Sequence, residues 1–296
     1  MHYFVMIKNA KPVYIALTSL ALVFNCKVIG LYGQPRFQDT VYRKWSVGLS
    51  YWHAFTFSGY TQVGENQYTG DKLSLVKDLG MSKLIYPELN LVHHISNASS
   101  FTFSAGRFFF SGHNNPGRNI FYNGALLKGA DGVSIDLTNF YRITLGFEKS
   151  FRSSSGFYPV LLAGLVYDAL NFHVNGTILP GYGQEDHEDF VTQSLPYPFV
   201  GGRLNKPLSP KSYLSVEATG TYIPLFKSFF YEGGQMSLHY ATANCGLQYW
   251  YKQKRFEIGI VYMWRWMKQY EYSKEDDPND FFLKASGLQL SGRYEL

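Results

Sequence analysis

The sequence has few cysteines, few charges and no hydrophobic run that suits a membrane helix. Its 296 residues include only two cysteines, Cys26 and Cys245. Charged residues make up 17% of the chain, and the net charge of +5 is not gathered into a basic stripe with interleaved aromatic residues. This distribution argues against nucleic-acid binding. The apolar run near the N-terminus has roughly 12 residues, fewer than the ~20 that a membrane-spanning helix needs.

The same N-terminal run fits an export signal. Lys8 and Lys11 precede the apolar run 13–24, and small residues follow at Gly30 and Gly33. A basic start, a short apolar stretch and a small-residue exit are typical of a secretory signal peptide. We therefore expect residues 1–33 to be a signal peptide and residues 34–296 to form one mature domain.

Cys26 offers an alternative, which is a lipoprotein. The residues before it, Val23-Phe-Asn25, lack the small residue expected ahead of a lipidated cysteine. Cleavage after residue 33 leaves Cys245 as the only cysteine of the mature chain, which excludes an intrachain disulfide.

Aromatic residues are abundant, at 18% of the chain with 24 Tyr and 24 Phe. Such numbers suit the interfacial girdles of a membrane β-barrel, where one part of a ring is apolar and another is wet.

Segments with a period of two recur along the chain, with turn residues between them. The last one, 281–296, places Leu288, Leu290, Tyr294 and Leu296 on one face and polar residues on the other. Nine earlier segments follow the same logic, at 45–51, 87–94, 101–106, 135–148, 161–167, 195–199, 214–219, 237–251 and 255–272. This makes ten strands. A closed antiparallel up-and-down transmembrane β-barrel requires an even number, which ten satisfies.

The C-terminal segment resembles the terminal strand of bacterial outer-membrane β-barrels, which end on an apolar residue with an aromatic residue two positions earlier. The resemblance implies a location in the outer membrane of a Gram-negative bacterium. It also implies recognition of this strand by the periplasmic insertion machinery, and contact with outer-membrane lipid and lipopolysaccharide.

The connections alternate in length, which predicts the topology. Short turns at 96–99, 151–156, 206–211 and 252–254 are expected in the periplasm. Longer loops at 56–83, 111–130, 172–190, 227–235 and 273–280 are expected outside the cell.

A soluble lipocalin-like barrel is the alternative architecture. In water, an outward row of Phe256, Ile258, Ile260, Tyr262, Trp264 and Trp266 would make a large exposed apolar patch, which lipid accommodates. The opposite face carries Glu257 and Arg265, which lipid would reject. An open sheet edge has no hydrogen-bond partner in lipid, so the sheet is expected to close.

The strand number limits the function. Wide aqueous pores have roughly 16 to 18 strands, whereas about eight strands leave an interior filled by side chains. We expect Glu88, Asp136, Glu148, Asp168, Glu217 and Glu257 to face inward and to pair with Arg142, Arg265 and Arg293. This predicts a non-enzymatic barrel with a narrow or plugged polar lumen, which binds a lipid, a small solute or a surface partner through external loops. A narrow channel and an outer-membrane hydrolase are the alternatives.

The motif His94-Ile-Ser96-Asn97 carries the first hydrolase alternative. It resembles the His-x-Ser-Asn motif of lipid A 3-O-deacylases, a resemblance that implies a serine nucleophile at Ser96 and a histidine base at His94. This sequence lacks the family's glutamate in the next strand segment, where Arg107 is the only ionisable residue. The purely structural interpretation of the motif is a Ser-Asn turn after an interfacial histidine.

Acidic residues in an external loop carry the second hydrolase alternative. Residues 185–189, with Asp168 and His173 nearby, fit the location of the catalytic groups in omptins, a family of ten-stranded outer-membrane proteases, but the omptin motifs are absent. The loop residues Asp186, His187 and Asp189 are candidate ligands for a weakly bound divalent cation. The residues 275–277 and Asp280 are a similar acidic group. We expect no other cofactor.

The segment from Gly70-Asp71 through Asp78-Leu79-Gly80 to Pro87-Glu88 resembles a pattern in uncharacterised small outer-membrane barrels. It predicts that the first external loop folds tightly back onto the rim, as a lid would. One residue breaks the alternation, because Arg107 falls on the lipid-facing side. A bulge, or a position near the rim where the side chain reaches water, would explain it.

Overall fold

The structure, a computed structural model, describes residues 44–64, 69–151, 156–181, 190–191, 196–231, 234–273 and 278–296. The predicted signal peptide lies outside these residues and stays a prediction, as does the domain boundary after residue 33. Ten long strand segments are present, as predicted. They are β1 (Trp45–Val63), β3 (Met81–Ser96), β4 (Ser99–Arg107) continued by β5 (Phe109–Asn114), β8 (Val133–Ser150), β9 (Tyr158–Gly176), β11 (Tyr197–Ser209), β12 (Ser212–Tyr231), β13 (Gly234–Gln253), β14 (Phe256–Ser273) and β15 (Pro278–Glu295).

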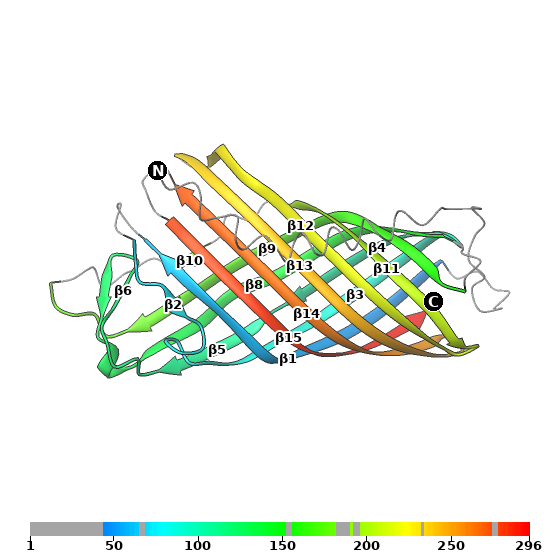
Figure 1. The fold of residues 1–296 in the computed structure, drawn as a ribbon, viewed down its shortest axis with the longest axis horizontal. Helices are drawn as coiled ribbons and strands as arrows, with labels where there is room; N and C mark the ends of the chain where they lie inside the picture. The colour runs from blue at the N-terminus through cyan, green and yellow to red at the C-terminus, as the bar shows by residue number, and fades with distance from the viewer. Residues whose placement is uncertain are drawn as a thin grey trace.

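The long strands form one closed antiparallel barrel. Each pairs with its neighbours in sequence, and β15 pairs with β1 along almost its whole length. The strands lie oblique to the long axis (Figure 1). Shorter elements are β2 (Leu73–Ser74), β6 (Ile120–Tyr122), β7 (Ala125–Leu127), β10 (Phe190–Val191) and the 3-10 turn Gly129–Asp131. Among the described residues, no helix is long and apolar enough to cross a membrane.

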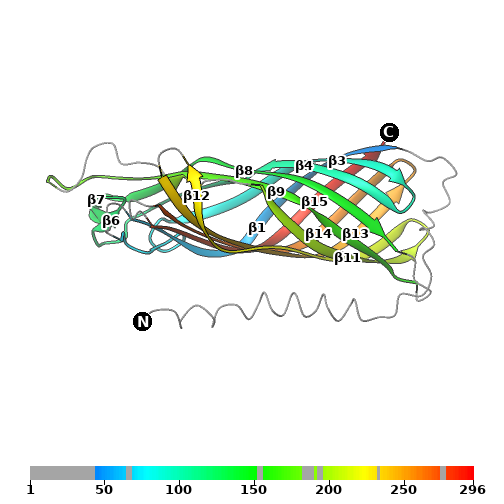
Figure 2. The ribbon, with the colours of Figure 1, turned by 90° about the horizontal axis from the view of Figure 1, so that it is seen from above.

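The two ends of the barrel differ, as the loop lengths predicted. The tight turns after β3, β11 and β13 lie at the end that holds the C-terminus, and β6 and β7 lie at the other (Figures 1 and 2). Outer-membrane barrels have short periplasmic turns and longer external loops. We call these the periplasmic end and the outer end.

Apolar side chains cover the outside of the barrel. Every long strand segment contributes at least one exposed large hydrophobic residue: Leu49, Leu89, Phe101, Leu145, Leu165, Val200, Val216, Leu247, Ile258 and Leu290. Polar neighbours on the opposite parity, such as Ser50, Gln248, Glu257 and Gln289, are buried inside. An apolar exterior band that every long strand contributes to is stable in lipid and not in water. The barrel therefore spans a membrane, and the predicted location in the bacterial outer membrane is confirmed.

One strand departs from the predicted alternation. Opposite β9, strand β8 carries an extra residue between Leu137 and Asn139. Because side chains alternate with a period of two, one extra residue reverses the two faces beyond it. Asp136, predicted to face the lumen, is exposed and accepts a hydrogen bond from Asn175. Ile135 is the neighbour of Asp136 in the predicted strand 135–148 and was therefore expected to face lipid, but it is fully buried inside. These two predictions were wrong for that reason.

Arg107, the residue that broke the pattern, ends β4. The next residue, Phe108, lies between β4 and β5 with its side chain buried inside the barrel. Arg107 itself is exposed, and its guanidinium lies 5.1 Å from the ring of Phe109. The pairing with β3 keeps the same register from Gly106 to Phe109, so no bulge is present at this point and Arg107 stays on the outer face.

The strands reach further toward the outer end than predicted. The first external loop was expected to begin at residue 56, but β1 continues to Val63, and β12 and β13 occupy most of the loop expected at 227–235. The strands were predicted too short because their apolar side chains point outward in the periplasmic half and inward near the outer end. Near the outer end, buried residues such as Val63, Tyr240 and Phe281 point inward, so the segment remains a strand although its outer face is polar.

These inward residues fill the outer half of the lumen. We call them the plug: Trp52, Phe108, Phe110, Ile135, Phe140, Leu170, Phe172, Tyr197, Tyr240, Phe281 and Leu283, all at most 6% exposed. Their rings are in mutual contact, as in the stacked pair Phe108 and Phe140 at 4.2 Å between centroids. Packed aromatic contacts of this kind resemble a protein core more than a pore.

Two external loops fold over the plug, and we call residues 69–80 and 115–132 the cap. In the first loop, Leu73, Leu75 and Leu79 are at most 1% exposed and belong to the same apolar cluster as the plug. Asp78 accepts the backbone N–H of Ser74, and Gly80 has a φ of +64°, which glycine adopts without strain. Arg118 of the second loop pairs with Asp71 at 3.0 Å. The first loop therefore folds back onto the rim, as predicted.

Candidate ligand cavity in the lumen

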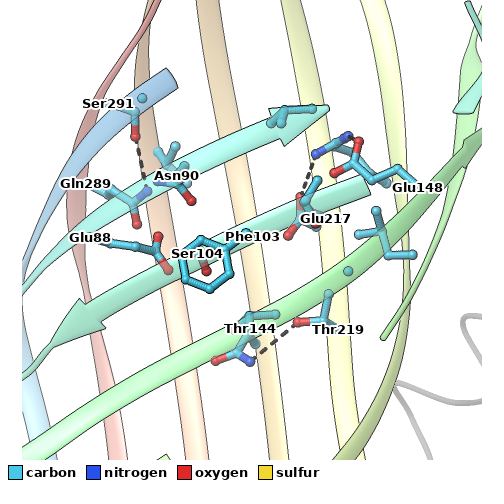
Figure 3. A pocket seen from close by; sticks show the side chains of 18 of the residues that line it. Glu88, Asn90, Phe103, Ser104, Thr144, Glu148, Glu217, Thr219, Gln289 and Ser291 are labelled. Atoms are coloured by element: carbon cyan, nitrogen blue, oxygen red, sulfur yellow. Dashed lines mark hydrogen bonds and ion pairs between the residues drawn. The ribbon is translucent and has the colours of Figure 1, made fainter. Parts of the chain in front are cut away.

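The periplasmic half of the lumen is hollow and polar. A cavity of about 290 Å³ lies next to the plug, and a second one of about 590 Å³ lies at the periplasmic mouth. Side chains from β3, β8, β12 and β15 surround the first (Figure 3). Neither lining includes a residue of the cap. The two cavities adjoin, because both are lined by His94, Glu148, Arg203, Gln248, Trp250 and Arg293.

Charged residues cross the lumen where the two cavities meet. Arg203 donates to Glu148 at 2.6 Å and to Glu217 at 3.3 Å, which joins β11 to β8 and β12. Arg293 lies 3.6 Å from Glu257. Gln248 donates to Glu217, and Trp250 donates to Gln248. Buried charges are stable when they are paired and hydrogen-bonded in this way.

A second charged group lies at the boundary between cavity and plug. Arg142 donates two hydrogen bonds to Asp168, at 2.6 and 2.7 Å, and the Tyr240 hydroxyl donates to the same carboxylate. The side chains of the pair are 10% and 2% exposed. Both were predicted to face inward. Bidentate geometry offsets part of the cost of removing the two charges from water.

Arg203 is a cavity-lining arginine that was not predicted from the sequence. The predicted sixth strand ended at Phe199, whereas β11 begins at Tyr197 and continues to Ser209, which carries Arg203 into the lumen. Pro198 and Pro207 both lie within β11, and prolines in a sequence argue against a strand, which is why its length was not predicted. The alternation of Gly201, Arg203 and Asn205 was the available signal.

Arg265 faces the cavity as predicted, but the expected carboxylate partner is missing. Its guanidinium carbon lies 4.8 Å from the ring centroid of Tyr86, 5.1 Å from that of Trp52 and 5.7 Å from that of Phe108. Within the described part of the chain, Arg265 forms no ion pair with a carboxylate and no hydrogen bond.

The candidate catalytic pair His94 and Ser96 lies at the periplasmic end. His94 Nε2 is 3.1 Å from the Oγ atom of Ser46. Ser96 Oγ accepts the backbone N–H of Ala98 within its own turn. The structure thus brings Ser46 to the histidine ring and shows Ser96 in the expected turn. A catalytic role for His94 and Ser96 stays a prediction.

Of the omptin-like group, Asp168 and His173 are described, whereas residues 185–189 lie outside the described residues. Asp168 points into the lumen and is bound by Arg142, whereas His173 lies on the opposite parity of β9. Asp280 accepts a hydrogen bond from Tyr60 and lies 4.0 Å from Lys268. The metal candidates Asp186, His187 and Asp189 lie outside the described residues. Within those residues, no group of three or more potential metal ligands is present.

Comparisons with known proteins find distant structural likenesses. No protein-family model matches the chain, and no curated protein matches it. The outer membrane protease OmpT from Escherichia coli aligns over 91% of this chain and 99% of its own, with 9% identity and a TM-score of 0.48. Neisserial surface protein A aligns over 85% and 97%, with 11% identity and a TM-score of 0.33. The translocator domain of the autotransporter NalP from Neisseria meningitidis aligns over 97% and 98%, with 12% identity and a TM-score of 0.40.

Proposed function

We propose that the protein is a non-enzymatic, non-conducting outer-membrane β-barrel that holds a small solute in a lumen open to the periplasm. The observation that carries the proposal is the division of the lumen, in which a charged cavity ends against an apolar plug. Ion flow needs a continuous wet path, and the closely packed rings of the plug interrupt it. A volume of about 290 Å³ is at the small end of ligand pockets in proteins, so the solute is small.

From the sequence we expected ligand binding in the external loops, whereas the proposed site is in the lumen. Leu73, Leu75 and Tyr122 of the cap direct their apolar side chains into the cluster that contains the plug. They stabilise the closed end and offer little free surface. On the outside of the barrel, the apolar exterior contacts outer-membrane lipid and lipopolysaccharide, and β15 is the strand offered to the insertion machinery. The hydrolase and the narrow channel stay alternatives.

The access route is testable with a cysteine inside the cavity. Thr144 lines the cavity next to the plug (Figure 3), and a Thr144→Cys change places a thiol there with the loss of one methyl group. Cys245 is first replaced by serine. The protein is folded into liposomes and treated with a small, charged, membrane-impermeant methanethiosulfonate. Ala130→Cys on the exposed part of the cap is the matched control, because its labelling reports the fraction of barrels whose outer end faces the reagent.

The labelled fractions separate three outcomes. If the lumen opens only to the periplasm, the labelled fraction of Thr144→Cys equals the fraction of Ala130→Cys that stays unlabelled. Labelling of Thr144→Cys in every barrel would indicate a continuous channel, and labelling in none would indicate a closed cavity. Either result would overturn the proposal. In planar bilayers, the wild-type barrel is expected to pass no steady single-channel current.

A further inference from the structure

The blind end of the cavity contains a guanidinium that differs from the other arginines of the lumen. Arg142, Arg203 and Arg293 each have a carboxylate within 3.6 Å. Within the described residues, Arg265 has none. Instead, three aromatic rings surround it, contributed by Trp52 of β1, Tyr86 of β3 and Phe108 between β4 and β5.

Aromatic rings satisfy only part of what a guanidinium needs. Ring faces attract the positive charge through their quadrupoles, but they do not replace the strong acceptors that five N–H donors require. Among the described residues, the buried Nε atom of Arg265 has no hydrogen-bond partner. The buried Nε1 atom of Trp52, in the same cage, also lacks a partner within that part of the chain. The end of the cavity therefore has an excess of hydrogen-bond donors.

The neighbouring charges do not remove this excess. Arg142 approaches the other side of the cage, with its guanidinium 5.9 Å from the ring of Phe108, and carries the same charge. The carboxylate of Asp168 is occupied by Arg142 and Tyr240. Glu88 accepts hydrogen bonds from the hydroxyls of Tyr86 and Ser50, at 3.0 and 3.3 Å, and forms no ion pair with Arg265.

Arg265 is packed between the aromatic cage and the cavity. Tyr86 is held over Gly106, where an added Cβ atom would lie 2.5 Å from the ring carbon Cζ. Arg265 itself lines the cavity. Its cross-strand neighbour Asn244, also in the lining, is bonded to Thr219 at 3.4 Å. Apolar residues, among them Val166, Phe199 and Met263, line the same cavity.

We infer that Arg265 is the anion-binding residue of the lumen and that the solute is a small oxyanion, a carboxylate or a phosphate, with room beside it for an apolar group. The planar guanidinium matches both headgroups through two parallel hydrogen bonds. A bound oxyanion supplies the acceptors that the barrel itself does not provide. This inference rests on the proposed function, because the solute enters through the periplasmic opening.

Isothermal titration of the full-length barrel in nonionic detergent tests the inference, with benzoate and inorganic phosphate as probes and benzamide as the neutral analogue. The wild-type protein is expected to bind benzoate or phosphate saturably, and benzamide at least about tenfold more weakly, because charge-assisted hydrogen bonds are lost. Binding of phosphate alone assigns a phosphate-bearing solute, and binding of benzoate alone assigns a carboxylate.

Three variants locate the site. Arg265→Gln is expected to weaken binding at least about tenfold. Arg118→Gln, which removes the same charge from the external cap, is the matched control and is expected to bind as wild type does. Asn244→Asp places a carboxylate opposite Arg265 and is expected to compete with the solute, so this variant should fold and not bind. It keeps the test decisive if Arg265→Gln does not fold.

Equal affinity of the wild type and either Arg265→Gln or Asn244→Asp would overturn the inference. Absence of saturable binding of both anions to a wild-type barrel whose Thr144→Cys counterpart is labelled from the periplasmic side would overturn it too, and would leave the proposed open cavity intact. An unlabelled Thr144→Cys would instead overturn the proposed function.

Discussion

The buried pair of Arg142 and Asp168 gives the sharpest stability prediction. The guanidinium and the carboxylate share two hydrogen bonds of 2.6 and 2.7 Å, with side chains 10% and 2% exposed. Asp168→Asn removes the negative charge and leaves the positive charge of Arg142 in a poorly hydrated place. Breaking a buried pair in this way costs about 3–5 kcal/mol. At about 1.4 kcal/mol per factor of ten, the lower figure corresponds to roughly a 100-fold change in the unfolding equilibrium.

Urea unfolding of the barrel in detergent micelles, followed by tryptophan fluorescence and circular dichroism, measures this cost. Asp131→Asn is the matched control, because Lys128 and Asp131 form a pair at 3.0 Å with side chains 46% and 37% exposed. An exposed pair of this kind contributes at most about 1 kcal/mol. A loss for Asp168→Asn no larger than that of the control would refute the reasoning, because it would mean that water reaches the Arg142 guanidinium.

The double variant Arg142→Met with Asp168→Leu separates the cost of one unpaired charge from the contribution of the pair. Replacing both members of a buried pair by apolar residues of similar size is often neutral or stabilising by about 1–4 kcal/mol. We therefore expect the double variant to unfold at a higher urea concentration than Asp168→Asn. A double variant less stable than the single one would show that the pair itself, and not the removal of one partner, holds this part of the lumen.

Three further predictions concern the cage, the cap and the outside of the barrel. Gly106→Ala places a methyl group 2.5 Å from Cζ of Tyr86 and 2.7 Å from the backbone oxygen of Pro87, and should lower the free energy of unfolding by roughly 1–3 kcal/mol in the same urea assay. Leu75→Ala removes a fully buried side chain and should cost about 2–5 kcal/mol, whereas Val76→Ala, at an exposed neighbour, should change stability by no more than about 0.5 kcal/mol. Equal effects of the two changes would argue against a packed cap. Cys245 is exposed on the outer face of β13, so in liposomes it should react with a lipid-soluble maleimide and not with a charged one. Rapid reaction with the charged reagent would place this face in water.

Local alternation was enough to predict the barrel. In the periplasmic half of β15, Leu288, Leu290 and Tyr294 alternate with Gln289, Ser291 and Arg293, and the structure has the first set outside and the second set inside, as predicted. The even strand number, the closure through β15 and β1 and the two unequal ends followed from that pattern, because lipid requires an apolar outer face and paired backbone groups.

Where alternation failed, the tertiary structure decided. An extra residue in β8 moves Asp136 to the outside of the barrel. Near the outer end, apolar side chains of β1 and its neighbours point inward and close the lumen. A period of two reveals that two faces differ, but not which of them faces lipid once both carry apolar residues. The pairing of charges has the same limit. The sequence alone predicted which arginines enter the lumen, apart from Arg203. The relative heights of β8, β9 and β14 in the folded barrel determine that Asp168 pairs with Arg142 and that Arg265 lies among three aromatic rings.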